Sequence, residues 1–402
     1  MRDGDITAIA KWLVGQGLAG ATETDLVTGF CARCVEGGLA VSRGLVLIDT
    51  LHPVYEGRAF NWHDAGGEFT EHFYGRSDIG EAAQDWLRSA WYHIVETGCG
   101  DVRRRFFRGD PCDFNRLQGY CDEGHRDYFA IVTPYSQEDA FGLMDCVYSH
   151  WMTREPEGFS DADIAALRRL VPILALAVKG PSLARIARTL VEVYLGRDAG
   201  ARVLSGRISR GVADEIDAVL WFSDLRGYTA ISDTAPPGEI IPLLNDYAEA
   251  AISAIDAAGG DVLKLIGDGI LAIFKADDRA EACRCALAAE ADLRARLTEL
   301  NARRAAEGRP ATTLYLGLHV GAVFYGNIGA DSRLDFTVVG PAVNEVSRIA
   351  ALCRSADRGV LLSSAFQAAV PEDERAHIVS VGRYALRGVG RAQELFTLDE
   401  TA

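Results

Sequence analysis

The sequence has few basic side chains. Its 402 residues include 41 lysines and arginines against 57 aspartates and glutamates, which gives a formal net charge of −16. It also contains no lysine-rich or arginine-rich run. Both shortages argue against non-specific binding to nucleic acid and to anionic membranes, because the summed field repels phosphate. We therefore predict no nucleic-acid partner, and a phosphate-bearing ligand must be held by a local site.

Long apolar runs are also missing. The longest, residues 170–178, ends at Lys179, whereas a membrane-spanning helix needs about 20 residues. The N-terminus carries two aspartates among its first five residues and lacks the pattern of a secretory signal. We expect a soluble, cytoplasmic protein without a membrane span.

Cysteine offers no disulfide framework. The nine cysteines are an odd number and are scattered, which favours reduced thiols in the cytosol. Cys31 and Cys34 form a C-x-x-C pair, but no second close pair of Cys or His accompanies them. We favour buried thiols on an amphipathic helix, and zinc or redox chemistry is the alternative.

The N-terminal part, residues 1–180, has the pattern of an α/β domain. Apolar runs at 45–51 and 128–135 alternate with helical stretches. Ser160 and Asp163 have the spacing of a capping box that opens the last helix.

The next segment, residues 181–215, reads as a helical and hairpin connector between two domains. We expect Pro172 to kink the preceding helix and the Gly180-Pro181 pair to end it. A second helical stretch should then run to Gly196, and spaced glycines beyond it suggest turns or a short hairpin.

From residue 216 onward the pattern changes to a second domain. An apolar run at 218–225 ends on an acid, as a buried central strand with a functional group at its tip would. Helical patterns follow at 237–257, 278–306 and 341–352, and strand patterns lie between them.

Two acids occupy similar settings at strand ends. Asp224 and Asp268 are separated by a helical pattern, so two neighbouring strands are expected to deliver both carboxylates to one point. Gly227 and Gly267 would allow close approach of a ligand, and Gly269 would continue a tight turn beside the second acid. Hard divalent cations prefer carboxylate oxygens together with phosphate oxygens, so the pair suits magnesium or manganese. The alternative is that each aspartate caps a helix or turn.

Three motifs in this order resemble the catalytic domain of class III nucleotidyl cyclases. They are DLRGYT at 224–229, KLIGD at 264–268 and TVVGPAVNEVSR at 337–348. The resemblance covers about residues 216–398, so we place the catalytic domain at 216–402, and it implies an α+β fold with a ferredoxin-like catalytic domain. It also implies a homodimer with two equivalent sites that converts ATP to 3′,5′-cyclic AMP and pyrophosphate.

The resemblance assigns a role to individual residues. Asp224 and Asp268 would hold two Mg²⁺ or Mn²⁺ ions per active site. Asn344 would orient the ribose, and Arg348 would stabilise charge on the α-phosphoryl group. Lys264 and Thr337 would recognise the base. Arg387 would bind phosphate, and Gly227 would allow the ligand to approach closely.

Base choice follows from Lys264 and Thr337. Adenine offers a ring-nitrogen acceptor and an amine donor, which an ammonium donor and a hydroxyl acceptor match. We therefore predict ATP as substrate, with a guanylate cyclase and a catalytically silent cyclase-like interaction module as alternatives. Thr337 also resembles the subgroup described as responsive to bicarbonate.

The N-terminal domain resembles GAF-type sensor domains, which implies a regulatory role. Seven aromatic and histidine side chains there could line a pocket for a small-molecule ligand or haem, but we favour ordinary core packing. They are Trp62, His63, His72, Trp86, Trp91, His93 and His125. Residues 160–211 would then transmit the signal to the cyclase.

Overall fold

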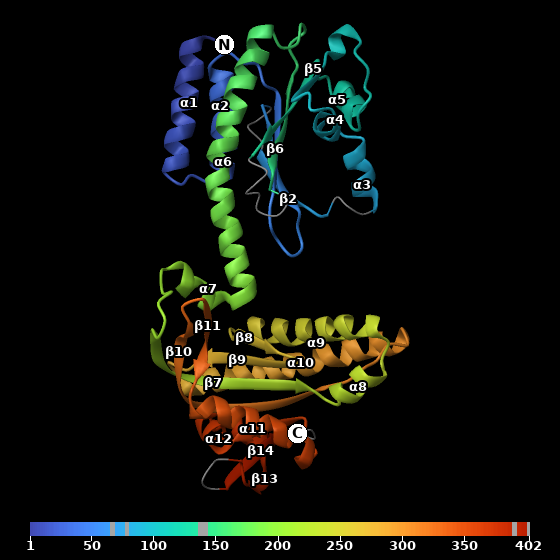
Figure 1. The fold of residues 1–402 in the computed structure, drawn as a ribbon. Helices are drawn as coiled ribbons and strands as arrows, with labels where there is room; N and C mark the ends of the chain where they lie inside the picture. Colours follow the sequence, from blue (N-terminus) through green and yellow to red (C-terminus); the bar gives the residue numbers. More distant parts are fainter. Residues whose placement is uncertain (65–68, 77–79, 136–143, 388–391, 400–402) are drawn as a thin grey trace. The chain divides into compact units, whose positions relative to one another are not determined.

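The computed structural model describes residues 1–64, 69–76, 80–135, 144–387 and 392–399. The chain divides into two compact units, Met1–Leu190 and Val191–Ala402. This division falls inside helix α6 (Asp161–Leu195). Each unit contains its own antiparallel-rich sheet with helices packed on it (Figure 1). The mixed α+β class expected from the sequence is confirmed.

The N-terminal unit contains a six-stranded antiparallel sheet in the order β3-β2-β1-β6-β5-β4. Its strands are β1 (Arg43–Asp49), β2 (Gly57–His63), β3 (Phe69–Tyr74), β4 (Asp101–Arg104), β5 (Asp127–Pro134) and β6 (Cys146–Thr153). Its other helices are α1 (Asp3–Leu18), α2 (Glu23–Glu36), α3 (Gly80–Leu87), α4 (Ala90–Thr97), α5 (Leu117–Asp122) and the short 3₁₀ turn Phe106–Arg108. The apolar runs at 45–51 and 128–135 correspond to β1 and β5, as expected.

Two apolar clusters cover the two faces of this sheet. Helices α1, α2 and α6 pack on one face, where Phe129 of β5 and Trp151 of β6 are fully buried. Helices α4 and α5 pack on the other, against the alternate residues Tyr128 and Met152. This division follows from the two-residue period of a strand.

The seven aromatic and histidine residues do not gather at one place. Trp62 is buried on the α2 side of the sheet, whereas Trp91 packs on the α4 side. His72 and His93 are exposed. His125 is buried, and its Nδ1 lies 3.0 Å from Ser42 Oγ. Core packing therefore accounts for Trp62 and Trp91, whereas Trp86 is half-buried with its ring against Tyr92 and Tyr148.

Cys31 and Cys34 are buried on α2, as the amphipathic-helix interpretation expected. Burial raises the pKa of Cys34 to about 12 and that of Cys31 well above its usual value. The thiols are thus kept protonated and unreactive. Within the described ranges, no cluster of three or more His, Cys, Asp or Glu side chains could hold a metal ion.

Helix α6 begins as predicted and continues further than predicted. Asp163 accepts hydrogen bonds from the backbone N–H and hydroxyl of Ser160, and Ser160 Oγ accepts the Asp163 N–H. The expected break at Gly180-Pro181 is wrong, because one helix runs through Pro172 and Pro181. Burial of its apolar face on the sheet outweighs the two lost backbone hydrogen bonds.

Helix α6 is also the one helix in the described part of the chain that is long and apolar enough to cross a membrane by length and composition alone. Of its most apolar window, 44% is buried inside the protein. Core helices of soluble domains meet the same criterion, so the absence of a membrane span stays a prediction.

The C-terminal unit contains an eight-stranded sheet in the order β13-β14-β12-β10-β7-β9-β8, with β11 paired to β10. Its strands are β7 (Ala213–Leu225), β8 (Asp261–Ile266), β9 (Gly269–Lys275), β10 (Leu314–Ala330), β11 (Arg333–Val339), β12 (Val360–Ser363), β13 (Ile378–Tyr384) and β14 (Gln393–Leu398). Its helices are α7 (Arg197–Leu204), α8 (Tyr228–Thr234), α9 (Pro237–Ala257), α10 (Arg279–Ala306), α11 (Pro341–Ala356), α12 (Ser364–Ala369) and the 3₁₀ turn Arg375–His377. The predicted helices at 237–257 and 278–306 are confirmed, but the expected short hairpin before residue 215 is replaced by α7 and the start of β7.

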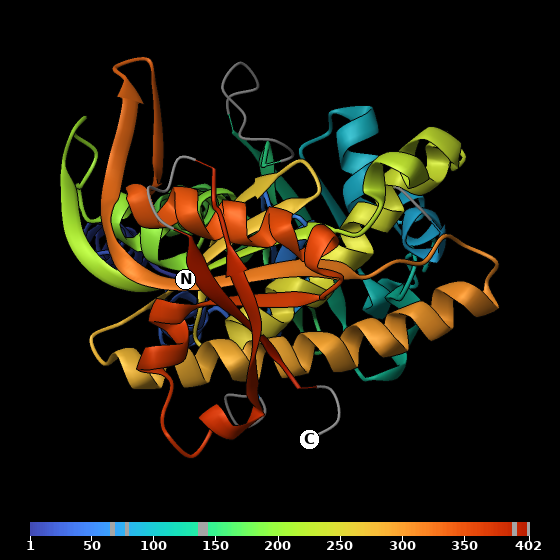
Figure 2. The ribbon, with the colours of Figure 1, turned by 90° about the horizontal axis from the view of Figure 1, so that it is seen from below.

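Helices α9 and α10 cover one face of this sheet, and α11 covers the other (Figures 1 and 2). Val219 and Trp221 of β7 point to the α9 and α10 side, whereas Ala218 and Leu220 point to the α11 side. Asp224 shares the parity of Ala218 and Leu220, so its side chain belongs to the α11 face. The fold therefore fixes the face on which polar groups of β7 can act.

Asp49 gives the N-terminal unit a pH-dependent stability. This carboxyl is 7% exposed and accepts a hydrogen bond from the Tyr74 hydroxyl. Desolvation, aided by nearby Glu56 and Asp145, raises the pKa of Asp49 to about 7. The folded state thus keeps a proton that the unfolded state loses near pH 4, and the resulting stabilisation is lost as pH rises from about 4 to 7.

We therefore expect Asp49→Asn to gain stability relative to wild type as pH rises through this window. The difference in the free energy of unfolding should grow by at most about 1.4 kcal/mol per pH unit. Urea unfolding of both proteins at pH 5, 6 and 7, followed by tryptophan fluorescence, measures it. A difference that stays constant across these pH values would contradict the assignment.

Candidate active site

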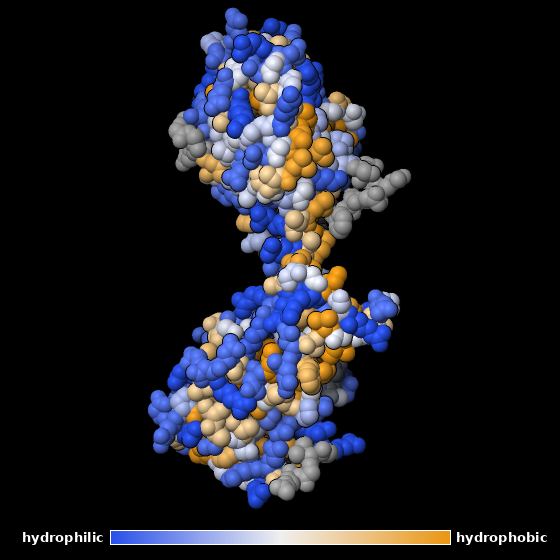
Figure 3. Space-filling view, turned by 90° about the vertical axis from the view of Figure 1, so that its left-hand side faces the viewer, coloured by the Kyte–Doolittle hydropathy of each residue, from blue (hydrophilic) through white to orange (hydrophobic). Residues whose placement is uncertain are grey.

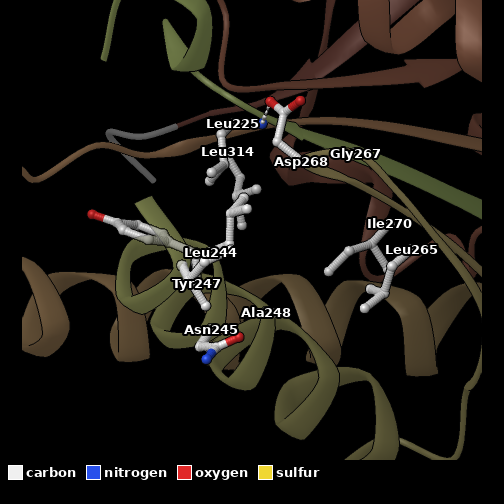
Figure 4. Close-up of a pocket in the computed structure, with 11 residues that line it drawn as sticks. Leu225, Leu244, Asn245, Tyr247, Ala248, Leu265, Gly267, Asp268, Ile270 and Leu314 are labelled. Atoms are coloured by element: carbon white, nitrogen blue, oxygen red, sulfur yellow. Dashed lines mark hydrogen bonds between the residues drawn. The ribbon is translucent and has the colours of Figure 1, made fainter. Parts of the chain in front are cut away.

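Asp224 and Asp268 meet where β7 ends. Strand β9 pairs with β7 on one side, with Ser223 opposite Ile270, and with β8 on the other. The two-residue turn between β8 and β9 contains Asp268, which therefore lies beside the tip of β7. Asp268 Oδ2 accepts the backbone N–H of Leu225 at 3.3 Å (Figure 4). The sequence expectation that both carboxylates reach one point agrees with this geometry, although Asp268 lies in a turn rather than in a strand.

Glycines allow this close approach. Gly267 adopts φ +65° at the first turn position, a backbone conformation that side chains rarely tolerate. A Cβ on Gly269 would lie 3.1 Å from Ser223 O, 3.2 Å from Ile266 O and 3.6 Å from Asp224 Oδ1. Gly269 thus lets the turn lie against the end of β7.

The position of Asp224 beside Asp268 makes its charged form less favourable. Desolvation is the largest cause that raises the pKa of Asp224 to about 6, and the hydrogen bond and negative charge of Asp268 follow. Among the residues that the structure describes, no lysine or arginine pairs with either acid. Two adjacent carboxylates without a basic partner form a donor set that fits a hard divalent cation, which would take its remaining ligands from water or phosphate oxygens.

Asn344 and Arg348 project from α11. Close packing fixes this helix on β10, because a Cβ on Gly317 would lie 2.8 Å from Ala350 N and one on Gly321 would lie 2.8 Å from Ala342 Cβ. Asn344 and Arg348 are one helical turn apart and lie off the buried side, exposed and half-buried respectively. In the described part of the chain, the Arg348 guanidinium has no ion-pair or hydrogen-bond partner.

The structure does not join these two halves of the predicted site. No hydrogen bond or ion pair among the described residues links the side chains of Asn344 or Arg348 to Asp224 or Asp268. A single chain therefore presents a carboxylate pair at the end of β7 and, separately, a polar face on α11.

Lys264 and Thr337 were predicted to act together. In the structure a third residue, Asp335, connects them. The Lys264 ammonium forms an ion pair with Asp335 of β11. Thr337 lies two positions further along the same strand and is 9% exposed. The sequence interpretation missed Asp335. The signal that could have found it is its two-residue spacing from Thr337, which places both side chains on one side of β11.

Gly227 and Arg387 take separate positions. Gly227 adopts φ +71° and caps the N-terminus of α8, three residues after Asp224. Arg387 is exposed in the turn after β13, and residues 388–391 lie outside the described ranges. The structure shows no contact from Arg387 to the acids or to α11 within the described residues.

A small pocket lies behind the Asp268 turn on its α9 side (Figure 4). Most of its lining is apolar, with Leu225 and Ile270 from the sheet and Leu244 from α9, and Asn245 and Asp268 add polar groups.

The part of the chain that carries this site is similar to a known protein family. Residues 212–399 match the family model of the adenylate and guanylate cyclase catalytic domain. This part of the chain is an adenylate and guanylate cyclase catalytic domain. The match includes all eight residues assigned from the motifs, so the carboxylate pair, α11 and the Lys264 strand all lie within the cyclase domain.

Named relatives agree with this domain assignment. An adenylate cyclase from Anabaena cylindrica is 38% identical over 160 residues, which are 39% of this chain and 31% of that protein. The matched segment spans about a third of the length of the first curated relatives. Solved structures similar to the chain include the adenylyl cyclase CyaB from P. aeruginosa, with 24% identity, a TM-score of 0.43, and coverage of 48% of this chain and 97% of that one. A guanylyl cyclase structure has 26% identity, a TM-score of 0.41, and coverage of 46% and 93%.

Gly269 provides a test of the carboxylate pair. In Gly269→Ala the new Cβ presses on two backbone carbonyls beside Asp224, so the turn must move and the two acids separate. We expect weaker binding of Mn²⁺, measured by titration calorimetry. Gly238→Ala is the matched control, because its Cβ meets nothing within 4 Å and alanine favours the interior of α9. Equal Mn²⁺ affinities of the two variants would contradict the role given to Gly269.

Proposed function

We propose that the protein is a homodimeric adenylate cyclase that converts ATP to 3′,5′-cyclic AMP and pyrophosphate. The observation that carries the proposal is the pair Asp224 and Asp268 in a cyclase domain. Among the residues that the structure describes, neither acid has a basic partner, and Arg348 of α11 has no acidic one. The Anabaena relative named as an adenylate cyclase supports it. A guanylate cyclase and a catalytically silent interaction module are the competing functions.

The reaction sets clear demands on the site. The ribose 3′ hydroxyl loses its proton and its oxygen bonds to the α-phosphorus, while the bond from that phosphorus to the pyrophosphate oxygen breaks. Asp224 and Asp268 would hold Mg²⁺ or Mn²⁺, which supplies Lewis-acid activation of the hydroxyl and neutralises the phosphates. Both carboxylates must be ionised for this role, and a bound cation favours the ionised form of Asp224.

Residues of α11 act on the same phosphorus. The Arg348 guanidinium, which has no competing partner in the described ranges, stabilises the charge that develops on the α-phosphoryl oxygens. Asn344, one turn earlier, hydrogen-bonds the ribose and holds the attacking oxygen in line. Loss of one such donor costs on the order of 10²–10³ in rate. Arg387 is proposed to bind the triphosphate, and Gly227 lets the backbone after Asp224 approach it.

A second copy of the chain completes the site in this proposal. One chain presents the acids and the α11 residues without joining them, so a two-fold dimer would place the acids of one protomer opposite α11 of its partner. Apolar side chains remain exposed on β10 and β11, including Phe324, Ile328, Leu334 and Val339. Strands β10 and β11 lie at the left of the C-terminal unit in Figure 1, and Figure 3, which views the protein from that side, shows apolar residues on this unit.

Lys264 and Thr337 support ATP over GTP. An ammonium donor and a hydroxyl that accepts match the donor and acceptor pattern of the adenine edge, and guanine presents the reverse pattern. We therefore assign adenine recognition to these two residues.

The N-terminal unit is proposed to be a cytoplasmic regulatory domain of GAF type, with domain limits at residues 1–180, 181–215 and 216–402. A small-molecule ligand would act through α6. Glu23 of α2 is 1% exposed and pairs with Arg58 of β2 at 2.7 Å. The same carboxylate accepts a hydrogen bond from the Ser182 hydroxyl at 3.2 Å and contacts Arg185 at 3.4 Å, so β2 and α6 share one buried charge.

Turnover by the purified full-length protein tests the proposed activity. With Mn²⁺ or Mg²⁺, we expect cyclic AMP from ATP at a higher rate than cyclic GMP from GTP. Asp224→Ala should reduce the rate by at least about 10², in the range reported for loss of a catalytic electrostatic group. Cyclic AMP formed at the wild-type rate by this variant would rule out the proposed metal site.

Complementation tests the shared site. Asp224→Ala and Arg348→Ala should each be inactive alone, but co-expressed chains form mixed dimers with one intact site. Because half of randomly formed dimers are mixed and each keeps one of two sites, activity should recover to about a quarter of wild type. No recovery, with mixed dimers demonstrated by two affinity tags, would contradict a site built from both chains.

A further inference from the structure

The chain that follows Asp224 is held by residues just before β10. Within the sheet, Asp224 lies opposite Tyr315 of β10. Beyond the sheet, the Arg226 N–H donates to the Thr313 carbonyl at 2.8 Å, and the Thr312 hydroxyl donates to the Arg226 carbonyl at 2.5 Å. Both backbone groups of the residue two positions after the acid are therefore bonded, and one of these bonds comes from a side chain.

Thr312 is itself fixed, although it lies outside the helices and strands. Its N–H donates to the Tyr247 hydroxyl of α9 at 2.6 Å, and its carbonyl accepts the side-chain amide of Asn301 from α10 at 2.7 Å. The Arg304 guanidinium of α10 donates to the Pro310 carbonyl at 2.6 Å. Tyr247 and Arg304 are 2% and 0% exposed. Bonds from buried polar side chains hold a backbone firmly, because little water competes for them.

The Thr312 hydroxyl is not needed to hold this segment. Both backbone groups of Thr312 are already bonded to α9 and α10, and the hydroxyl is directed at the Arg226 carbonyl instead. The chain then turns into α8 at Gly227, which adopts φ +71°. Because glycine has wide backbone freedom, a bond from outside the turn fixes the direction in which the chain leaves Asp224.

Tyr247 takes part in the support of both acids. Its hydroxyl bonds Thr312 beyond the end of β7, and its side chain also lines the pocket behind the turn that carries Asp268. Figure 4 shows this hydroxyl directed away from Asp268. One buried side chain of α9 therefore lies behind the β8–β9 turn and also holds the residue that restrains the end of β7.

We propose that Thr312 is a positioning residue for the metal site: its hydroxyl fixes the backbone after Asp224, so that this carboxylate stays beside Asp268 when no cation is bound. Two adjacent negative charges repel each other, and a loose strand end would move to separate them. A site that is held in place need not be rebuilt when a cation binds, so its affinity is higher. This inference rests on the proposed function and deepens it.

Thr312→Val tests the proposal, because it removes the hydroxyl and keeps the shape of the side chain. We expect Mn²⁺ to bind about two- to tenfold more weakly to the nucleotide-free protein in titration calorimetry, the range that corresponds to one ordinary hydrogen bond. In turnover assays the half-saturating Mn²⁺ concentration should rise by a similar factor. The kcat at saturating Mn²⁺ and the ratio of ATP to GTP turnover should stay close to wild type.

Thr298→Val is the matched control. The Thr298 hydroxyl also donates to a backbone carbonyl, that of Arg294 at 2.9 Å, but both residues lie on α10. The substitution removes a bond of the same kind and leaves the bond to Arg226 in place, so the Mn²⁺ affinity should equal that of wild type. Thr312→Ser keeps the hydroxyl and should retain most of the wild-type affinity.

A wild-type Mn²⁺ affinity in Thr312→Val would overturn the proposal, and so would an equal loss of affinity in Thr298→Val. If Thr312→Val does not fold, Tyr247→Phe carries the same test, because it removes the acceptor of the Thr312 N–H. This second variant should weaken Mn²⁺ binding and lower the thermal midpoint, since a backbone N–H loses its partner. A lower midpoint with unchanged Mn²⁺ affinity would show a role in folding alone and overturn the proposal.

The same measurements separate this inference from the proposed function. If the wild type bound Mn²⁺ but made no cyclic nucleotide, the proposed activity would be wrong, and calorimetry would still decide the role of Thr312. If the wild type bound no Mn²⁺, both the proposed metal site and the role of Thr312 would be wrong.

Discussion

The contact between the end of β7 and the β8–β9 turn is the constraint on which the catalytic unit depends. It places two carboxylates together because β9 pairs with strands on both sides, and Gly269 leaves no side chain between the turn and Ser223. Burial raises the pKa of Asp224 to about 6, and the hydrogen bond and negative charge of Asp268 add to the shift. A fold keeps such an arrangement when a cation offsets the repulsion, so the cost in the metal-free protein and the capacity to bind metal have the same origin.

The negative charge of the whole chain limits which groups can bind a phosphate-bearing ligand. A net charge of −16 repels a nucleoside triphosphate at long range. Binding must therefore come from short-range groups that are not already neutralised. Arg348 is such a group, because it has no partner among the described residues, whereas Lys264 is held by Asp335. Under the proposed function, the guanidinium of Arg348 is thus the group that suits phosphate charge.

Sequence reasoning succeeded where periodicity decides the structure. The helices at 237–257 and 278–306 and the strand that carries Asp224 follow from local patterns and from Asp278, whose side chain caps α10. It failed at Pro181, because the burial of α6 and the bonds from Ser182 and Arg185 to Glu23 depend on residues more than 150 positions away. Asp335 was missed for the same reason, since its contact with Lys264 joins strands 71 residues apart.

The separation of the acids from α11 within one chain has a consequence for control. When each site needs groups from two protomers, the rate depends on how the two cyclase domains meet as well as on the residues themselves. A displacement of about 1 Å between the acids and Arg348 is enough to cost a large factor in rate. Helix α6 is bonded through Glu23 to the N-terminal sheet and continues without a break to Leu195. In the proposed homodimer, a regulatory N-terminal unit would therefore need to supply only a small movement of this helix, not a rebuilt active site, to change the rate.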